Sequence, residues 1–131
     1  MQNMSGGKTA LGLDNNVGAL ICYLGNIICA LGLIYSIIVL VTDKTNKLPR
    51  FHAMQSILLS AAGLIAGLIF GMVFGAAAAA RSGLLSGLGG LLYMIFGLAM
   101  LAAVVFCAIK AYQGQIFKLP VIGDLADKWS N

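Results

Sequence analysis

Three long stretches of almost uncharged, apolar residues decide what this chain can fold into. Only 9% of its 131 residues are charged and 60% are hydrophobic, whereas a soluble domain carries about 25% charged residues. A helix needs roughly 20 apolar residues to cross the ~30 Å hydrocarbon core of a bilayer. We therefore expect one all-α integral membrane domain, built as a bundle of transmembrane helices.

The apolar stretches predict three transmembrane helices, or four if the first is broken. Gly25–Asn26 marks a bend in the first stretch, where a polar side chain must find a partner. Pro49 precedes the second helix, and Gly114 can end the third. A short amphipathic helix, with Trp129 as interfacial anchor, is expected in the tail. The expected parts of this single domain are a polar N-terminal tail at 1–14, span one at 15–42, a basic loop at 43–50, span two at 51–80, span three at 84–112 and an interfacial tail at 116–131.

The positions of lysine and arginine predict the orientation of the spans. With three spans, the loop at 43–50 and the region after span three share a side and hold six basic residues, against Lys8 and Arg81 on the other side. Cytoplasmic segments carry the excess of basic residues. We therefore expect a multi-pass protein of the cell inner (cytoplasmic) membrane, with its N-terminus outside and its C-terminus in the cytoplasm. The start of the chain lacks the pattern of a signal peptide, so the first apolar stretch is expected to be retained.

Span two carries a row of glycines at four-residue intervals. Lipid tails are as apolar as leucine, so membrane helices associate by close packing, which small residues permit. At 100° per residue, the serines that precede the row fall on nearly the same face. The expected helix-packing residues are Ser56, Ser60, Gly63, Gly67, Gly71 and Gly75. They can pack within the chain or between chains, and the alternative is that small residues are simply frequent in membrane helices.

Three polar residues, Arg50, His52 and Gln55, stand where span two begins and form an expected cluster at the membrane interface. We expect His52 and Gln55 to meet a partner helix, and Arg50 to point away and reach lipid phosphates. His52 has three candidate roles: a hydrogen-bonded packing residue, which we favour, a proton- or ligand-sensing group, or an axial ligand of a tetrapyrrole. Bound lipid is expected, and a pigment at His52 is the minor alternative.

Other residue patterns argue against several classes of function. Cys22, Cys29 and Cys107 lie in apolar stretches and form no Cys-x-x-Cys pair, so we expect packing residues and no metal site. The basic residues are scattered and lack interleaved aromatic residues, which argues against binding of nucleic acid. The spans hold no acid/base pair and no nucleophile with a base, so we expect no enzymatic activity.

The segments "LDNNVGALICYLG", "LPRFHAMQSILL" and "IKAYQGQIFKLPVIGDLADK" resemble a family of small, mostly uncharacterised prokaryotic membrane proteins. That family is distantly related to a membrane component of the chloroplast inner-envelope protein-import (Tic) machinery. The resemblance covers Leu13 to Lys128, and its most specific parts are "RFHAMQS" at 50–56 and "AYQG" at 111–114. It implies an all-helical membrane protein of three or four spans and brings no catalytic residues.

Two functions are compatible with these patterns. The first is a non-catalytic accessory subunit that packs by its glycine row against a larger membrane complex, such as a respiratory or photosynthetic assembly. A hetero-complex is expected rather than a homo-oligomer. The alternative, suggested by the import relatives, is an oligomeric transport or protein-translocation component. It would use Asn26, Gln55 and Ser56 as scarce polar groups near the membrane.

Overall fold

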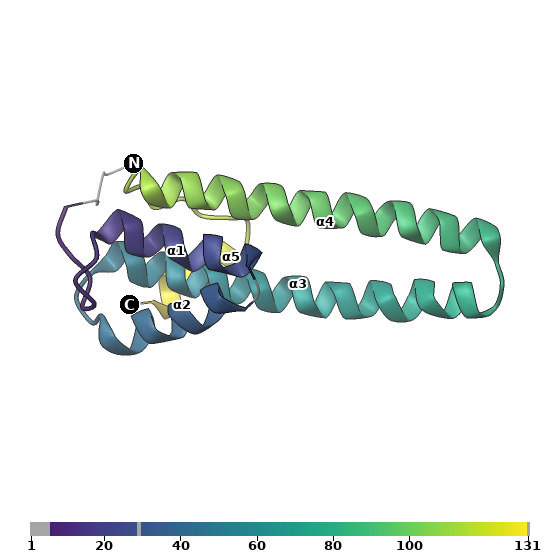
Figure 1. The fold of residues 1–131 in the computed structure, drawn as a ribbon, viewed down its shortest axis with the longest axis horizontal. Coiled ribbons are helices and arrows are strands. Elements are labelled where there is room, and N and C mark those ends of the chain that lie inside the picture. The colour runs from purple at the N-terminus through teal and green to yellow at the C-terminus, as the bar shows by residue number, and fades with distance from the viewer. Residues whose placement is uncertain (1–5, 29, 131) are drawn as a thin grey trace. The chain divides into compact units, whose positions relative to one another are not determined.

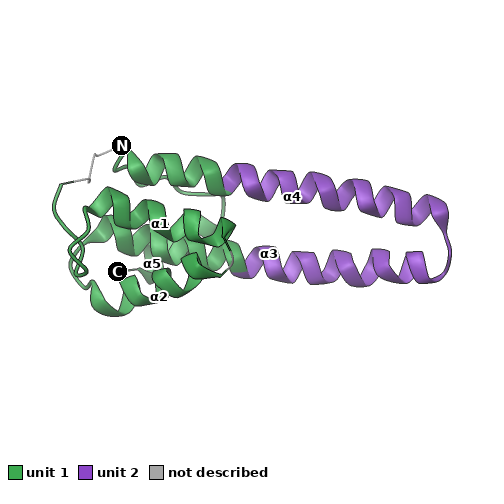
Figure 2. Ribbon diagram, viewed as in Figure 1, with its two compact units in different colours: residues 1–60, 104–131 green, residues 61–103 purple. Residues whose placement is uncertain are grey.

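The computed structural model describes residues 6–28 and 30–130, and its regular elements there are helices. They are α1 (Asn15–Ile27), α2 (Leu31–Thr42), α3 (Lys47–Ala79), α4 (Gly83–Tyr112) and α5 (Ile122–Trp129) (Figure 1). The all-α prediction is confirmed, and so is the short C-terminal helix. The chain forms two units: residues 1–60 with 104–131, here called unit 1, and residues 61–103, called unit 2 (Figure 2).

The prediction of three transmembrane helices is wrong. Within the described ranges, two helices, α3 and α4, are long and apolar enough to cross a membrane. The first apolar stretch is broken after Ile27, because the Ile28 N–H bonds to the Gly25 carbonyl at 3.3 Å and the chain turns before α2 begins. The resulting α1 and α2 have 13 and 12 residues, too few for either to span the ~30 Å core.

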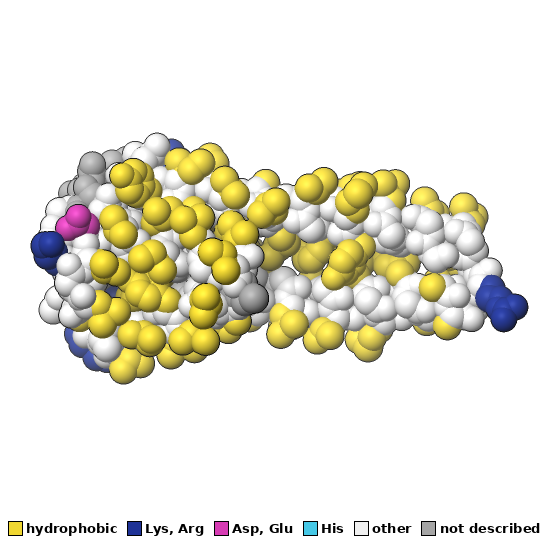
Figure 3. All heavy atoms as spheres, in the orientation of Figure 1, with side chains coloured by type: hydrophobic (Ala, Val, Ile, Leu, Met, Phe, Trp, Pro, Cys, Tyr) yellow, Lys and Arg dark blue, Asp and Glu magenta, His cyan; other side chains and the backbone are white. Residues whose placement is uncertain are grey.

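The long helices face outward with apolar side chains. Only 6% of the most apolar window of α3 and 11% of that of α4 is buried by the rest of the chain. The core helix of a soluble protein is mostly buried, whereas a membrane helix exposes such side chains to lipid. Hydrophobic side chains accordingly cover much of the visible surface of each unit (Figure 3).

The ends of the long helices follow known capping geometry. Gly114 has a φ of 72°, and the Gly114 and Gln115 N–H groups bond to the carbonyls of Ala111 and Lys110. This pattern is a Schellman cap, in which glycine adopts the left-handed conformation at no steric cost. The predicted role of Gly114 as a stop is therefore confirmed. Pro49 lies in the first turn of α3, where its missing N–H needs no helical partner.

Within unit 1, α1 and α2 form an antiparallel hairpin. Gly25 and Gly32 meet at its closed end, where a Cβ added to Gly25 would lie 2.5 Å from the Gly32 backbone nitrogen. At its open end the Ala10 N–H donates to the Asp43 carboxylate at 3.4 Å. The core behind the hairpin brings together α1, the start of α3 and the end of α4. Its buried members are Ala19, Tyr23, Leu48, Cys107, Ala108 and Ala111.

Within unit 2, α3 and α4 pair through aromatic side chains. The Phe70 ring lies 5.8 Å from that of Phe74 and 5.4 Å from that of Phe96, measured between ring centroids. Phe74 packs directly over Gly89 of α4, where a Cβ would overlap the phenylalanine ring. The close approach in this pair therefore depends on a glycine of α4.

Candidate functional site

The polar residues at the start of α3 are buried in unit 1. His52, Gln55 and Ser56 are each 0% exposed. The other buried side chains of unit 1 are largely apolar. A polar group removed from water costs free energy unless it is hydrogen-bonded. The partners of these three side chains therefore determine what this site can do.

Both ring nitrogens of His52 are engaged. The Nε2 atom lies 2.8 Å from the Gln115 carbonyl oxygen, and the Nδ1 atom lies 2.8 Å from the Tyr23 hydroxyl oxygen. A carbonyl oxygen can only accept, so Nε2 carries the hydrogen and Nδ1 accepts from the Tyr23 hydroxyl. A neutral imidazole with both nitrogens used has no lone pair left for a metal. This arrangement does not favour the alternative of a tetrapyrrole ligand at His52, which stays a prediction.

Gln55 binds the extended segment that follows α4. Its side-chain NH₂ donates to the Phe117 carbonyl at 3.0 Å and to the Tyr23 hydroxyl at 3.0 Å. Its carbonyl oxygen accepts from the Leu119 N–H at 3.2 Å. With the Gln115 carbonyl held by His52, alternate backbone groups of residues 115–119 are paired by side chains of α3. Non-helical backbone in apolar surroundings requires such partners.

A second set of hydrogen bonds holds α1 against α3. The Asn26 NH₂ group donates to the hydroxyls of Ser56 at 2.7 Å and Ser60 at 3.0 Å. The Ser56 hydroxyl in turn donates to the Cys22 carbonyl at 2.6 Å. The polar side chain at the predicted bend thus finds its partners one and two turns along the face of α3 that begins at His52.

Arg50 does not reach toward lipid phosphates, and that expectation is wrong. Its Nη1 donates to the carbonyls of Leu40 at 2.9 Å and Asp43 at 2.8 Å, and its Nε donates to the Ser130 carbonyl at 2.8 Å. The first two carbonyls end α2 and the third follows α5. Carbonyl groups at helix C-termini carry partial negative charge and lack helical partners, which an arginine fork satisfies. Arg50 thus fastens the ends of two helices.

Together these contacts make the polar cluster a set of clamps. Asn26, Gln55 and Ser56 were the residues on which the transport alternative relied, and each is bonded to another part of unit 1. The side chains hold the α1–α2 hairpin and the 115–119 segment against α3. Their chemistry is that of packing, the role favoured for His52 from the sequence.

The glycine row lies in unit 2, and its members differ in surroundings. A Cβ at Gly63 would lie 2.7 Å from the Met100 Cε, and one at Gly67 would lie 3.9 Å from the Tyr93 hydroxyl. Beside Gly71 and Gly75 there is nothing within 4 Å. Each four-residue step turns a helix by about 400°, so a row of four glycines rotates by about 120° in all. The first two glycines thus face α4, and the last two have turned away from it.

Within unit 1, the tail packs against the other helices through α5. Gly123 and Ala126 face inward, and Trp129 is 53% exposed, a position open to the interfacial role expected for it. Lys118 lies 2.8 Å from one Asp127 carboxylate oxygen, and Lys47 lies 3.4 Å from the other. The hydrogen bond between Lys118 and Asp127 raises the pKa of the lysine and lowers the pKa of the carboxyl group. The Lys47–Asp127 pair joins the tail to the start of α3, and the Lys118–Asp127 pair lies within the tail.

Sequence reasoning missed Tyr23 and Gly32. Tyr23 connects His52 with Gln55 through hydrogen bonds. Because Tyr23 lies one turn before Asn26, the two residues form a polar face on the first apolar stretch, and this pattern could have indicated its role. A Cβ on Gly32 would lie 2.5 Å from the Asn26 backbone nitrogen, a contact that only the folded hairpin creates. Cys22 and Cys107 are buried free thiols, whereas Cys29, also predicted to be a packing residue, lies outside the described residues.

Comparison with known proteins gives the family. Residues 14–126 match the family described as the magnetosome magnetite crystal formation protein family. The chain belongs to this family. A UPF0132 membrane protein of Methanocaldococcus jannaschii is 36% identical over 127 residues, covering 95% of this chain and 96% of the relative. One of Archaeoglobus fulgidus is 30% identical over 116 residues, covering 88% of this chain and 95% of the relative.

The matched segment contains His52, Gln55 and Ser56 with their hydrogen-bond partners, and all of unit 2. The prediction of a small prokaryotic membrane-protein family is confirmed by these relatives, which are named as membrane proteins. No solved structure matches the chain.

Proposed function

We propose that this chain is a non-catalytic membrane subunit whose unit 2 packs against helices of another membrane protein. The observation that carries the proposal is the uncovered stretch of α3 at Gly71 and Gly75. Glycine weakens a helix by up to ~1 kcal/mol per residue in water, so two of them with open space beside them favour a contact from outside the chain. Unit 1 supports the same role, because its polar groups are used for internal clamping.

The lengths of the helices support a two-span arrangement in the bilayer. At 1.5 Å per residue, the 33 residues of α3 extend about 50 Å and the 30 residues of α4 about 45 Å. The helices α1 and α2 are about 20 and 18 Å long. We therefore propose that α3 and α4 cross the membrane, while the α1–α2 hairpin enters and leaves it on one side.

Two spans change the proposed orientation. Because α3 and α4 return the chain to its starting side, the segments before α3 and after α4 share that side. Arg81 alone among the eight basic residues lies in the turn between them. The other basic residues are Lys8, Lys44, Lys47, Arg50, Lys110, Lys118 and Lys128. The positive-inside rule then places both termini in the cytoplasm, with the protein in the cell inner membrane.

The hairpin has the polarity that a one-sided insertion needs. Exposed apolar side chains surround its closed end, where Ile27 is 50%, Ile28 67% and Leu31 59% exposed. Polar and charged residues, Asp14 and Lys44 among them, lie at its open end. A segment of 10–14 apolar residues with such ends is typical of a re-entrant element.

The packing role is tested by enlarging the uncovered glycines. Purification of the full chain from its native membranes in mild detergent should yield a complex with another membrane protein. Gly71→Leu should weaken that complex about tenfold or more, because the added side chain holds the partner backbone away. Co-purification followed by quantitative mass spectrometry measures the loss.

Val73→Leu is the matched control for this experiment. Val73 lies on the same helix, is 57% exposed and already carries a branched side chain, so its enlargement should leave the complex intact. Equal recovery of partner with Gly71→Leu and with the unchanged chain would contradict the proposal. Recovery of the chain alone, as a monomer, would contradict it as well.

The family description names magnetite crystal formation, and the relatives are named only as membrane proteins. A packing role in a membrane is compatible with both the family description and the names of the relatives. Kinship with the chloroplast import component stays a prediction.

A further inference from the structure

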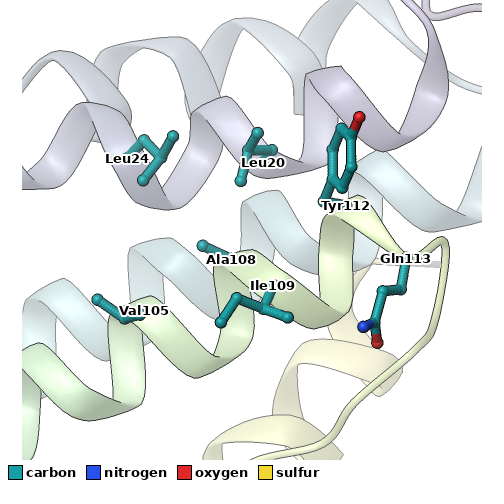
Figure 4. Close-up of a pocket in the computed structure, with 7 residues that line it drawn as sticks. All are labelled: Leu20, Leu24, Val105, Ala108, Ile109, Tyr112 and Gln113. Atoms are coloured by element: carbon teal, nitrogen blue, oxygen red, sulfur yellow. The ribbon is translucent and has the colours of Figure 1, made fainter.

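An open apolar groove runs along the surface of unit 1 between α1 and α4. Its volume is about 330 Å³, near the lower end of the range found for small-molecule sites. Figure 4 shows Leu20 and Leu24 of α1 on one side and Val105, Ala108 and Ile109 of α4 on the other. The groove therefore lies on the part of the chain where two helices meet and their side chains leave space.

The groove is apolar along its length and polar at one end. Tyr112 and Gln113 line it where α4 ends, beside the start of α1, and the Asn16 NH₂ donates to the Tyr112 carbonyl at 3.1 Å. From Asn16, Leu20 and Leu24 lie one and two turns along α1, so the apolar part extends about 11 Å along the helix. One polar end on a long apolar slot matches the polarity of an amphiphile.

We infer that this groove is a binding site for one acyl chain of a membrane phospholipid, with the head group at Gln113. Apolar cavities stay dry and accept apolar ligands, and the bilayer around a membrane protein supplies acyl chains at high concentration. A tail gains no hydrophobic free energy by leaving other tails. The binding preference therefore comes from filling the groove and from hydrogen bonds between the head group and the exposed Gln113 amide. The inference concerns unit 1 and does not depend on the packing role of unit 2.

Native mass spectrometry of the full chain, released from bilayers of phosphatidylethanolamine and phosphatidylglycerol, tests this inference. The unchanged chain should retain one phospholipid. Val105→Phe, which fills the groove, should lower retention by about fivefold or more. Leu98→Phe adds the same side chain two turns earlier on α4, outside the groove, and should retain the lipid like the unchanged chain. Equal retention in both variants, or none in the unchanged chain, would overturn the inference.

A second variant tests the inference even if Val105→Phe fails to fold. Gln113 is exposed, so Gln113→Leu leaves the helices intact while it removes the polar end of the groove. Retention should fall in this variant also. A photoreactive residue at Ile109 identifies the occupant in native membranes: a crosslink with the mass of a phospholipid is expected, and a crosslink to a protein would assign the groove to a partner helix and overturn the inference.

Discussion

The two units of the chain use opposite chemistry to hold helices together. In unit 1, side chains such as His52 and Gln55 make hydrogen bonds of 2.8–3.2 Å to distant backbone groups and to Tyr23. In unit 2, the pairing of α3 and α4 rests on the rings of Phe70 and Phe74 and on Gly89. Both units expose apolar side chains, but unit 1 fixes the positions of its helices by specific hydrogen bonds, whereas the pairing in unit 2 depends on close apolar packing.

The largest effect is expected from Gln55→Leu in unit 1. This change leaves the partly buried Phe117 carbonyl and Leu119 N–H without their side-chain partner, and an unsatisfied buried group costs about 1–3 kcal/mol. We expect the free energy of unfolding to fall by roughly 2–4 kcal/mol. Unfolding in mixed micelles, followed by circular dichroism, measures the change.

Met72→Leu is the corresponding change in unit 2. Met72 is 68% exposed, so its replacement by a side chain of similar volume should leave the unfolding transition unchanged. A loss of stability for Met72→Leu as large as that for Gln55→Leu would remove the contrast between the units.

A smaller effect is expected from alanine at a closely packed glycine. Gly32→Ala places a Cβ against the backbone of Asn26, and overpacking of this kind costs about 1–3 kcal/mol. Gly71→Ala meets open space and should not lower the stability of the isolated chain. Thermal unfolding of the two variants side by side gives the comparison. Equal destabilisation would show that Gly71 is covered within the chain.

The smallest effect is expected at the ion pairs of the tail. Because the hydrogen bond from Lys118 lowers the pKa of Asp127 in the folded state, the pair stabilises the fold above the ordinary carboxyl pKa and loses this effect as acid protonates the folded carboxylate. Asp127→Asn should thus be slightly less stable than the unchanged chain at pH 7, and equally stable at about pH 2. Chemical unfolding at both pH values measures the difference.

Asp124→Asn serves as the control for this titration. Its side chain is 80% exposed and lies 3.6 Å from Lys118, so its removal should change stability less than Asp127→Asn at pH 7. A pH-independent difference between Asp127→Asn and the unchanged chain would show that the carboxylate charge is not what acts there.

The sequence predicted what composition and helical periodicity control. The long apolar helices, the stop at Gly114 and the short tail helix all depend on residues near each other in the chain. A bend or break at Gly25–Asn26 was predicted, but the first apolar stretch was still expected to span the membrane. Its closure into two short helices depends on the contact of Gly25 with Gly32. Periodicity reports the faces of one helix and says nothing of such a closure.

The candidate site was predicted in its residues and less well in their partners. His52, Gln55 and Ser56 were recognised because polar groups in an apolar helix require bonds. The partners of Arg50 lie 10, 7 and 80 residues away along the chain, which no local pattern reveals. The glycine row was read as one face because its four-residue spacing hides a rotation of about 40° per step.

Labelling that locates Lys44 on one side of the membrane distinguishes two transmembrane helices from three. Single cysteines introduced by Lys8→Cys, Lys44→Cys and Arg81→Cys, with the native cysteines replaced by alanine, can be labelled by an impermeant maleimide in oriented vesicles. With two spans and a hairpin that enters and leaves on one side, positions 8 and 44 should label from the same side and position 81 from the other. Labelling of positions 8 and 44 from opposite sides would show that the first apolar stretch crosses the bilayer and would contradict the account.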